Sequence, residues 1–533
     1  MHAGRPAVVA EEPAAPDPAL LSGPAQTAGL RMGTPRGRWV LFTTVLGSSL
    51  AMLDATVVNV ALERIGADLG AGFSGLQWTV NAYTLTLASL ILLGGSLSDR
   101  LGRRRVFLVG VVWFAAASLL CGLAPNIETL VVARALQGVG GALLTPGSLA
   151  IISASFAGED RAAAVGAWSG LGGVAGAIGP FLGGWLVEWS WRAVFLVNLP
   201  VAVLILAVAA RHVPETRDPD AAPGLDWTGT VLVVAGLGGL TYALTAAGED
   251  GRSIQVVLWG AVGVVALVAF TVVQRRSRHP LVPPVLFRNA QFSAANAVTL
   301  LVYAALGVVF VLLVLQLQVV SGYSPLLAGT ALLPVTALML LFSARAGALA
   351  QRIGPRLPMT VGPLLAAAGL LLLSRTGPGA SYVADVLPGA LVFGAGLTLL
   401  VAPLTATVLA SAEDRFAGVA SGVNNAVARA AGLLAVAVVP VAAGIGGDDY
   451  TDPDAFGSGF RTAMLICAGL LLAGAVVAAA AVRRPLDRAA VPAGDAGWGE
   501  ARLPLEECLH CGVDGPQLHP RGTTAGRPRD DTP

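Results

Sequence analysis

Long apolar stretches, separated by short polar segments, recur along the chain from residue 39 to residue 482. A bilayer core about 30 Å thick is crossed by roughly 20 apolar residues in a helix, so each stretch predicts a transmembrane helix. The predicted spans cover residues 39–61, 76–97, 106–124, 129–153, 162–187, 193–210, 228–247, 254–273, 292–320, 326–349, 358–374, 381–410, 416–444 and 460–482. The pattern therefore predicts an all-α polytopic membrane protein with 14 transmembrane helices.

A short polar motif occurs twice, 252 positions apart. Residues 95–104 and 347–356 share the pattern G-x-L-x-[D/Q]-R-x-G-x-R, and each copy lies between two apolar stretches. The first copy follows the second span and the other follows the tenth span, so spans 1–6 correspond to spans 9–14. We therefore expect two related halves of six helices, with spans 7 and 8 inserted between them as an extra pair.

The arginines of the polar segments are distributed unevenly between the two sides of the membrane. The number of spans is even, so both termini lie on the same side. If that side is the cytoplasm, 20 arginines between residues 31 and 488 are cytoplasmic, and five are outside, at positions 64, 192, 252, 375 and 461. Basic residues are in excess in cytoplasmic segments of membrane proteins, which predicts cytoplasmic termini.

The chain divides into five predicted segments. They are a disordered cytoplasmic arm at 1–37, a six-helix half at 38–210, a linker with the inserted pair at 211–291, a second half at 292–482 and a disordered cytoplasmic tail at 483–533. The arm has no removable signal peptide pattern. The tail contains Cys508 and Cys511 with His519 nearby, but the cluster lacks the paired spacing of a zinc fold, and we interpret it as incidental rather than as a metal site.

The composition excludes an ordinary soluble protein, because 55% of the residues are hydrophobic and 12% are charged, whereas about a quarter are charged in soluble domains. The basic residues are all arginine, and this bias, with the excess of Ala and Gly, suggests a bacterial plasma membrane protein. Without lysine the chain has no nucleotide-binding G-x-x-x-x-G-K-[ST] loop. We expect an ion gradient to supply the energy, with no ATP, nucleic acid, cofactor or metal, and no enzymatic activity.

Two opposite charges lie at the same predicted depth in the membrane. Asp54 in the first span and Arg134 in the fourth are each about 8 Å below the outer surface of the apolar core, at 1.5 Å per residue. A charge at this depth costs at least about 2.5 kcal/mol without a partner. Burial favours a protonated carboxyl and a nearby arginine favours the charged form. We therefore predict a proton-coupling pair, with a purely structural ion pair between the two helices as the alternative.

Other polar residues within the spans are candidates for a central cavity. Arg429 lies near the middle of the thirteenth span, after Asn424 and Asn425, and could contact substrate, anchor a helix or take part in coupling. Asn59 and Gln137 are further cavity candidates. By contrast, Arg345 and Asp385 lie near the ends of their spans, and we expect both at the membrane interface.

The fifth span contains a row of glycines. Gly172, Gly176, Gly179 and Gly183 are spaced four, three and four residues apart, which places them on one helix face. Such a face permits close contact with a neighbouring helix, and Pro180 removes one backbone hydrogen bond. We expect a bulky substitution, Gly176→Leu, to abolish transport without preventing membrane insertion.

Four motifs together resemble the major facilitator superfamily, and within it the fourteen-helix branch of drug:proton antiporters, over residues 38–483. The motifs are the loop Gly95-Ser-Leu-Ser-Asp99-Arg100-Leu-Gly102-Arg103-Arg104, the segment Leu53-Asp54-Ala-Thr-Val-Val-Asn59-Val-Ala-Leu62, the segment Arg134-Ala-Leu-Gln137-Gly-Val-Gly140 and the helix Gly172-Gly-Val-Ala-Gly176-Ala-Ile-Gly179-Pro180-Phe-Leu-Gly183-Gly184. The second motif departs from the family pattern, because Glu63 stands where the family has proline.

The resemblance implies roles for these motifs. The Arg134 segment is similar to the family's proton-coupling segment, and the glycine helix to its antiporter motif, which is associated with export and packs between the halves. In the loop, Gly95, Asp99, Arg100, Gly102 and Arg104 would act in gating. A carboxylate at Asp99 can cap the amino end of another helix, and in the family it helps close the cytoplasmic side. The second copy has Gln351 in its place, which predicts a one-sided lock.

These observations predict a secondary active exporter that exchanges amphipathic drugs or antibiotics for protons by alternating access between the two halves. Its partners would be a small amphipathic molecule, protons and the lipid bilayer. A dedicated exporter of one endogenous metabolite or antibiotic, giving self-resistance, is the alternative within transport. A membrane sensor or scaffold without transport is the alternative from another class, and the charges at 54, 99 and 134 argue against it.

Overall fold

The computed structural model describes residues 30–218, 224–248, 253–277, 280–413, 416–446 and 452–482, with some side chains of the fifth span left out. Within these residues the chain is helical, apart from loops and one isolated backbone bridge between Leu30 and Phe156. The first 29 residues and the tail after Val482 lie outside the described residues. The predicted tail cluster of Cys508, Cys511 and His519 is part of that tail.

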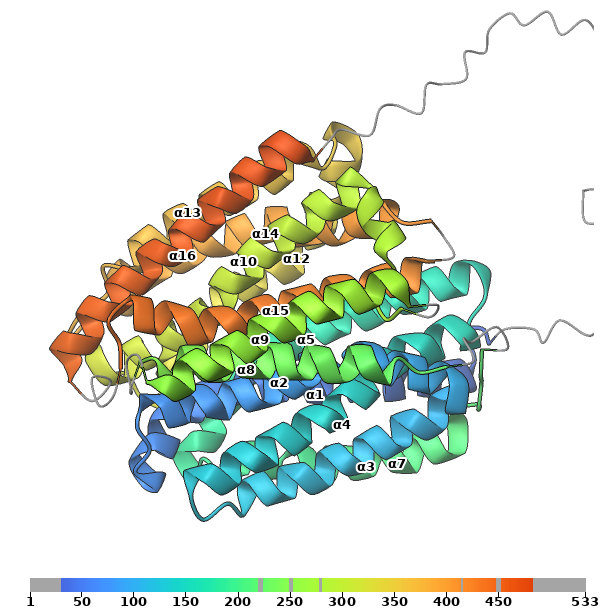
Figure 1. Ribbon diagram of the computed structural model, residues 1–533, viewed down its shortest axis with the longest axis horizontal. Helices are drawn as coiled ribbons and strands as arrows, with labels where there is room; N and C mark the ends of the chain where they lie inside the picture. Colours follow the sequence, from blue (N-terminus) through green and yellow to red (C-terminus); the bar gives the residue numbers. More distant parts are fainter. Residues whose placement is uncertain are drawn as a thin grey trace, which may run out of the picture. The chain divides into compact units, whose positions relative to one another are not determined.

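Seven helices form the first half: α1 (Pro35–Leu69), α2 (Phe73–Leu101), α3 (Arg103–Gly122), α4 (Ile127–Ser155), α5 (Gly158–Trp189), α6 (Ala193–Leu196) and α7 (Asn198–His212). An inserted pair follows, α8 (Trp227–Ala246) and α9 (Ile254–Arg276), and then a short 3-10 turn, η2 (Pro284–Arg288). The second half contains α10 (Ala290–Leu315), η3 (Gln316–Val320), α11 (Pro325–Thr330), α12 (Leu333–Ile353), α13 (Arg356–Leu373), η4 (Tyr382–Val386), α14 (Leu387–Ala410), α15 (Ala417–Ala442) and α16 (Pro453–Ala481). Figure 1 shows the two halves as separate bundles, with α3 and α7 at one edge and α13 and α16 at the other.

The predicted fold is confirmed. Thirteen helical segments of the described residues are long and apolar enough to cross a membrane, and α5, with 32 residues, occupies the remaining predicted span. Several predicted spans consist of two helical pieces: α6 with α7, α10 with η3, α11 with α12, and η4 with α14. Hydrophobicity alone could not locate these breaks, because the residues on both sides are apolar.

The first helix begins earlier than predicted, inside the segment expected to be a disordered arm. Thr34 caps α1, because its side-chain oxygen accepts a hydrogen bond from the backbone nitrogen of Gly37 over 3.1 Å. Pro35 then occupies the first turn, where its missing N–H costs nothing. Leu30 is also fixed, since its nitrogen donates to the carbonyl oxygen of Ser155 over 2.8 Å.

The duplication seen in the sequence recurs in backbone conformation. Gly102 and Gly354, 252 positions apart, both have a positive φ, of 116° and 86°. Gly102 lies just before α3 and Gly354 just before α13, which correspond to the third span of each half. Only glycine adopts such a conformation without strain. Gly110 and Gly362, also 252 apart, allow α3 to approach α4 and α13 to approach α14, because a Cβ at either position would lie within 3 Å of the neighbouring helix. The two halves are therefore built alike.

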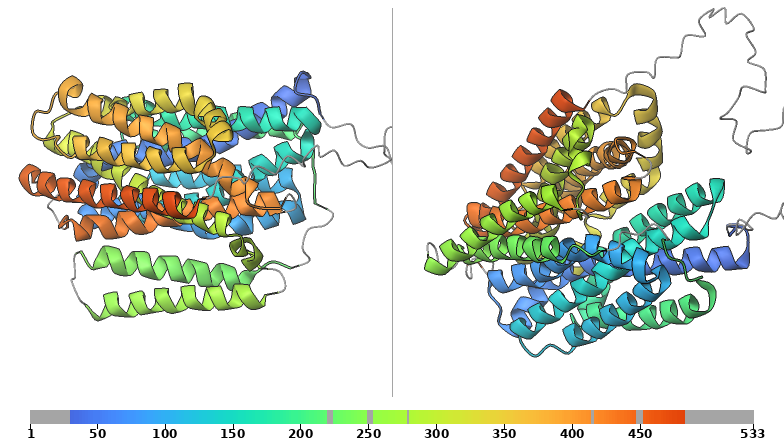
Figure 2. Two further views of the ribbon diagram at one scale, coloured as in Figure 1. Left: turned by 90° about the horizontal axis from the view of Figure 1, so that it is seen from above. Right: turned by 45° about the vertical axis from the view of Figure 1, so that its right-hand side comes forward.

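The inserted pair, α8 and α9, contacts both halves. The two helices pack closely on each other, since a Cβ at Gly239 would lie 2.8 Å from the carbonyl oxygen of Trp259. Helix α8 packs against α2 of the first half and α15 of the second, and the left view of Figure 2 shows the pair beside the main bundle. Most side chains of α9 are exposed, as expected for a helix that faces lipid.

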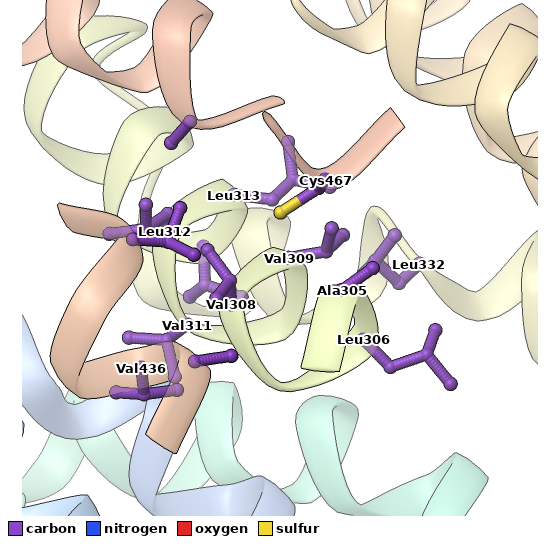
Figure 3. Packing of buried hydrophobic residues seen from close by; sticks show 14 of the residues in the cluster. Ala305, Leu306, Val308, Val309, Val311, Leu312, Leu313, Leu332, Val436 and Cys467 are labelled. Atoms are coloured by element: carbon purple, nitrogen blue, oxygen red, sulfur yellow. The ribbon is translucent and has the colours of Figure 1, made fainter. Parts of the chain in front are cut away.

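The most buried helix of the second half is α10. Its residues Val308, Val309 and Leu312 are at most 1% exposed, and they pack with Val436 of α15 and Cys467 of α16 (Figure 3). Such a position explains why α10 is almost wholly apolar. It also fixes α15, which carries Arg429, against a rigid neighbour.

The two halves contact each other near the predicted outer ends of their helices. The side-chain amide of Gln318 in η3 donates to the carbonyl oxygen of Val60 over 3.1 Å, and that of Gln77 in α2 donates to Val436 over 2.8 Å. Helix α5 packs on α11, where a Cβ at Gly184 would lie 2.6 Å from the Cα of Leu326. Further along α5, in contrast, Gly176 has no such neighbour within 4 Å. The halves are therefore joined at the outer end of α5 and apart beside Gly176.

Candidate functional site

Asp54 of α1 and Arg134 of α4 form an ion pair that is buried within the first half. Each residue is 1% exposed, and Nη1 of Arg134 donates to Oδ2 of Asp54. The Nε of Arg134 donates to the carbonyl oxygen of Thr79 in α2 over 3.0 Å. The structure therefore brings together the two charges whose shared depth was noted in the sequence.

Three uncharged polar residues complete the surroundings of Asp54. Gln137, one helical turn after Arg134, donates to Oδ1 of Asp54 over 2.7 Å and accepts from Nη1 of Arg134 over 2.6 Å. Asn198 donates to the same Oδ1 over 3.1 Å. Ser118 of α3 accepts from Gln137 and Asn198 over 2.8 and 3.3 Å. Side chains of α1, α3, α4 and α7 and a backbone carbonyl of α2 thus form one network, and both carboxylate oxygens are hydrogen-bonded.

Asn198 reaches Asp54 because the sixth span is broken. Helix α6 ends at Leu196 and α7 begins at Asn198, so the asparagine lies at the start of a new helix rather than in the middle of one. The sequence carried a signal that we did not use, an Asn-Leu-Pro segment inside an apolar stretch. Polar residues inside transmembrane helices are expensive and usually functional.

Aromatic rings cover the arginine. The Cζ of Arg134 lies 4.3 Å from the ring centroid of Tyr83 and 5.8 Å from that of Phe195. The hydroxyl of Tyr83 donates to the carbonyl oxygen of Ala51 over 3.1 Å. A cation over an aromatic face gains about 2 kcal/mol when it is removed from water. Tyr83 therefore stabilises Arg134 independently of Asp54.

Charge neutralisation dominates the energetics of this site. Removing one partner of a buried ion pair costs about 3–5 kcal/mol, because the other charge is left uncompensated in a low dielectric. Besides Asp54, Arg134 contacts the Thr79 carbonyl, the Gln137 oxygen and the Tyr83 ring. These contacts help to hold the arginine in place in addition to the ion pair.

Asp99, near the end of α2, makes a local ion pair in the described state. The resemblance implies that Asp99 caps another helix when the cytoplasmic side is closed, and among the described residues no such cap is formed in this state. Arg103 instead donates from Nε and Nη2 to Oδ1 of Asp99, over 2.9 and 2.8 Å. Because Arg103 follows Asp99 by only four residues, it is a close partner for the Asp99 carboxylate when the halves are apart.

The amino end of α3 is capped by Glu215, which sequence reasoning missed. Its Oε1 accepts from the backbone nitrogen of Arg104 over 3.2 Å, and a Cβ at Gly102 would lie 2.6 Å from the same oxygen. Nη2 of Arg104 donates to the carbonyl oxygen of Ala210 over 2.7 Å. The extended segment 213–218 adds a backbone bond from the nitrogen of Arg103 to Thr216, of 2.9 Å. The loop is thus tied to the segment after α7.

The other loop residues lie at the end of the bundle. Arg100 lines a pocket of about 370 Å³ together with Arg105, Arg217 and apolar residues of α2, α3 and α4. Gly95 lies against Pro146 of α4, where a Cβ would be in ordinary contact at 3.6 Å. Neither residue approaches the Asp54 site.

The glycine row of α5 packs only in part. Gly179 and Gly183 lie against α1, where a Cβ would meet Thr56 and Val57 respectively. The predicted packing contact at Gly176 is absent, because nothing lies within 4 Å of its Cβ position. Gly172 lies where side-chain surroundings are not described. A glycine outside the row, Gly184, makes the contact with α11, and the carbonyl of Pro180 lies against Gly329 of that helix.

Most of the cavity candidates have other contacts. Gln137 belongs to the Asp54 network rather than to a cavity. Asn424 donates to Asn296 and Thr299 of α10 over 3.1 and 2.8 Å, which ties α15 to α10. Asn425 is exposed and donates to the carbonyl of Ser421 in its own helix over 3.3 Å.

Two candidates keep polar atoms without partners. Asn59 is 9% exposed and its Oδ1 accepts no hydrogen bond, and the Nε of Arg429 is buried without an acceptor. Arg345 is exposed near the end of α12, with its Cζ 5.4 Å from the ring of Phe342. Asp385 accepts from the backbone nitrogen of Ser381 over 2.7 Å at the start of η4. These last two positions suit residues at an interface.

The chain is similar to known transporters over most of its length. The family model described as the Major Facilitator Superfamily matches residues 44–436. The chain is 37% identical over 478 residues to the puromycin resistance protein of Streptomyces alboniger, which covers 86% of this chain and 94% of that protein. It is 37% identical over 391 residues to the multidrug resistance protein Stp of Mycobacterium tuberculosis, covering 72% of each.

A third relative is the probable actinorhodin transporter of Streptomyces coelicolor, 35% identical over 452 residues, or 81% of this chain and 78% of that protein. Among solved structures, a bacterial homologue of the human lysosomal transporter Spinster matches 84% of this chain and 98% of its own, with a TM-score of 0.61 and 18% identity. At this identity the likeness concerns the fold alone.

Proposed function

Because the chain belongs to the major facilitator superfamily, we propose that it is a secondary active exporter of amphipathic drugs or antibiotics, driven by proton exchange. Relatives named for antibiotic resistance, multidrug resistance and antibiotic transport support the direction of transport. As an integral membrane protein of a bacterial membrane, it would have both termini in the cytoplasm, as the arginine distribution favours.

One observation carries the proton-coupling proposal: a carboxylate and an arginine are paired inside the membrane, with every carboxylate oxygen hydrogen-bonded. A purely structural pair would be an expensive way to join α1 and α4, because well-packed apolar residues stabilise as well or better. If Asp54 exchanges a proton during transport, its carboxylate has a function that an apolar residue could not replace.

In the proposed cycle Arg134 keeps its other partners when it separates from Asp54. In the described state Arg134 and two amides donate hydrogen bonds to Asp54. When the halves close on the cytoplasmic side and open outside, a shift between α1 and α4 separates the pair, and Asp54 takes a proton from outside. On return, contact with Arg134 releases the proton to the cytoplasm.

The contacts between the halves support the direction of opening in this cycle. The halves are joined near the outer ends of α5, α11 and η3, and α5 is open beside Gly176. With cytoplasmic termini, this arrangement corresponds to a cavity that opens inward. A substrate from the cytoplasm or the inner leaflet would then bind between the halves.

Efflux of a fluorescent amphipathic dye, measured with and without an uncoupler, tests the function. We expect cells that express the protein to export the dye, and the uncoupler to stop the export. A protein that never exports any member of a broad panel would instead act as a sensor or scaffold.

Names of relatives also favour a dedicated exporter as the second candidate, since two of them carry the name of a single antibiotic. The same panel separates the two candidates. A dedicated exporter protects against one compound class, whereas a multidrug exporter protects against several unrelated classes.

A further inference from the structure

Arg429 is a cation inside the membrane for which the described residues provide no counter-ion. It lies 12 residues into α15, about 18 Å from the start of the helix. Its Nε is buried without an acceptor, and it takes part in none of the ion pairs between described residues. Arg134, which is 1% exposed, has an anion, two oxygen acceptors and an aromatic face, whereas Arg429 is partly exposed. The two arginines therefore have different purposes.

A lone arginine in mid-membrane requires an explanation. Its insertion costs at least about 2.5–3.5 kcal/mol, and snorkelling to an interface is the usual relief. That relief is unavailable about 18 Å from the helix start, because an arginine side chain extends much less than this distance. The uncompensated charge points to a partner that is not part of the protein.

The position of Arg429 is fixed by a close approach of two helices. A Cβ at Gly307 of α10 would lie 2.7 Å from the Cα of Gly432 of α15, so the two backbones are in contact. Arg429 lies three residues before Gly432 and Tyr303 lies four residues before Gly307, so each is one turn away from this helix contact. Because α10 is buried among apolar neighbours, α15 packs against a rigid helix, and the backbone position of Arg429 is fixed.

Arg429 lies on a helix at the boundary between the halves. Helix α15 meets α2 of the first half on both sides of the arginine. A Cβ at Gly422 would lie 3.0 Å from the side chain of Leu92, and Gln77 donates to the carbonyl oxygen of Val436 over 2.8 Å. A group bound at Arg429 would therefore lie near the surface where the two halves meet.

We propose that Arg429, with Tyr303 near it, forms a recognition site for an acidic group on the exported molecule, a carboxylate or an ionised phenol or enol. A guanidinium binds such groups through two parallel N–H donors. The ring of Tyr303, which is partly exposed, provides flat apolar surface for the rest of an amphipathic molecule. The inference rests on the proposed function and specifies its substrate class as amphipathic acids.

The site predicts discrimination by charge. An acidic molecule neutralises Arg429 on binding, whereas a neutral molecule of the same shape leaves the cation unpaired, and a cationic one is repelled. A charge-assisted hydrogen bond in a buried site corresponds to about a tenfold difference in affinity or more. We expect this difference between an acid and its ester.

Binding of dansyl-leucine and its uncharged methyl ester tests the proposal, because the two probes share one fluorophore and differ in the carboxylate. Full-length protein in lipid nanodiscs would be titrated with each probe, without any proton gradient. The wild type is expected to bind the acid about tenfold more tightly than the ester. Arg429→Gln should abolish that preference by weakening acid binding, while Arg429→Lys should retain part of it. Arg345→Gln, which removes an exposed arginine of the same half, should keep the preference.

Equal binding of acid and ester by the wild type, or failure of both to bind, would overturn the proposal. An equal loss of both probes in Arg429→Gln protein that remains monodisperse would also overturn it, because the arginine would then act on packing alone. The test is separate from that of the proposed function. A protein that prefers the acid but shows no uncoupler-sensitive export would contradict only the export proposal, and the reverse result would contradict only the acidic substrate class.

Discussion

The side-chain amide of Asn198 donates to Oδ1 of Asp54 over 3.1 Å, although the two residues lie 144 positions apart in the sequence. Asn198 begins α7 just after a break in the sixth span, and Asp54 lies in the buried part of α1. The bond joins the sixth span to the proton site. Through this bond α7, at the edge of the first half, contacts the Asp54 carboxylate directly.

Replacing Asn198 by leucine is expected to reduce proton-coupled export, because Oδ1 of Asp54 then keeps only the donor from Gln137. The lost buried hydrogen bond contributes about 0.5–1.5 kcal/mol, so the thermal unfolding midpoint should also fall. Uncoupler-sensitive dye export and thermal unfolding measure the two effects. Gln255→Leu, which removes an amide from the exposed face of α9, is the matched control. Export and unfolding that both coincide with the wild type would show that Asn198 does not support Asp54.

Adding a single methyl group at Gly329 is expected to disrupt the junction between the halves. A Cβ there meets the carbonyl oxygen of Pro180, so α5 and α11 must move apart, at a cost of about 1–3 kcal/mol. Gly329→Ala should lower the thermal unfolding midpoint and reduce export. Gly166→Ala in α5, where a Cβ meets nothing within 4 Å, should leave both unchanged. Equal behaviour of the two variants would mean that this approach of α5 to α11 has no role.

Gly176→Leu now tests a different point from the one suggested by the sequence. In the described state no neighbour lies within 4 Å of its Cβ position. We expect the variant to insert and to bind substrate normally, and to lose export only because the leucine prevents the halves from closing on this side. A parallel binding and export assay checks the separation. Loss of binding together with export would contradict this explanation.

Gln318→Leu is expected to loosen the outer contact between the halves. The amide bond from Gln318 to the carbonyl of Val60 is buried and contributes about 1 kcal/mol, or roughly a fivefold population change. Hydrogen exchange of the backbone in η3 and α11 should become faster by about this factor. Thr376→Val, in which the lost hydroxyl bonds within its own half to Leu373, provides the control. Unchanged exchange in Gln318→Leu would show that the outer contact does not depend on this bond.

Glu215→Ala should weaken the attachment of the loop between α2 and α3. The carboxylate caps the amino end of α3 at Arg104, a contribution of about 0.5–2 kcal/mol. The nearby pair with Arg105, at 3.7 Å between partly exposed groups, adds little. Limited proteolysis at the loop, compared with Glu188→Ala, measures the effect. Equal cleavage rates in both variants would exclude the cap.

The helices could be predicted from the sequence because the cost of exposing backbone in lipid forces every long apolar stretch into a helix. The repeat at Gly102 and Gly354 was also predictable, because a positive φ requires glycine in both copies. The pairing of Asp54 with Arg134 followed from their shared depth together with the family likeness. These features depend on local composition or on distance along one helix.

The remaining contacts of the site depend on where a span is broken and on how the chain is oriented after the break. No local sequence pattern encodes either property. Asn198 and Glu215 reach their partners only because α6 ends early and the segment after α7 returns to α3. The spacing of glycines places Gly176 on one face with Gly179 and Gly183, but it could not tell that Gly176 has no neighbour within 4 Å while the other two do. Asn424 likewise has a polar partner on α10 that the sequence of α15 does not reveal.

Proton movement driven by substrate in proteoliposomes tests the central claim most directly. Purified wild-type protein and Asp54→Asn would be reconstituted with a pH-sensitive dye inside, and an exported substrate would be added across an imposed substrate gradient. The wild type is expected to move protons against the substrate flux. Asp54→Asn is expected to bind substrate and move no protons. Undiminished substrate-driven proton movement in Asp54→Asn would contradict the claim that Asp54 carries the coupled proton.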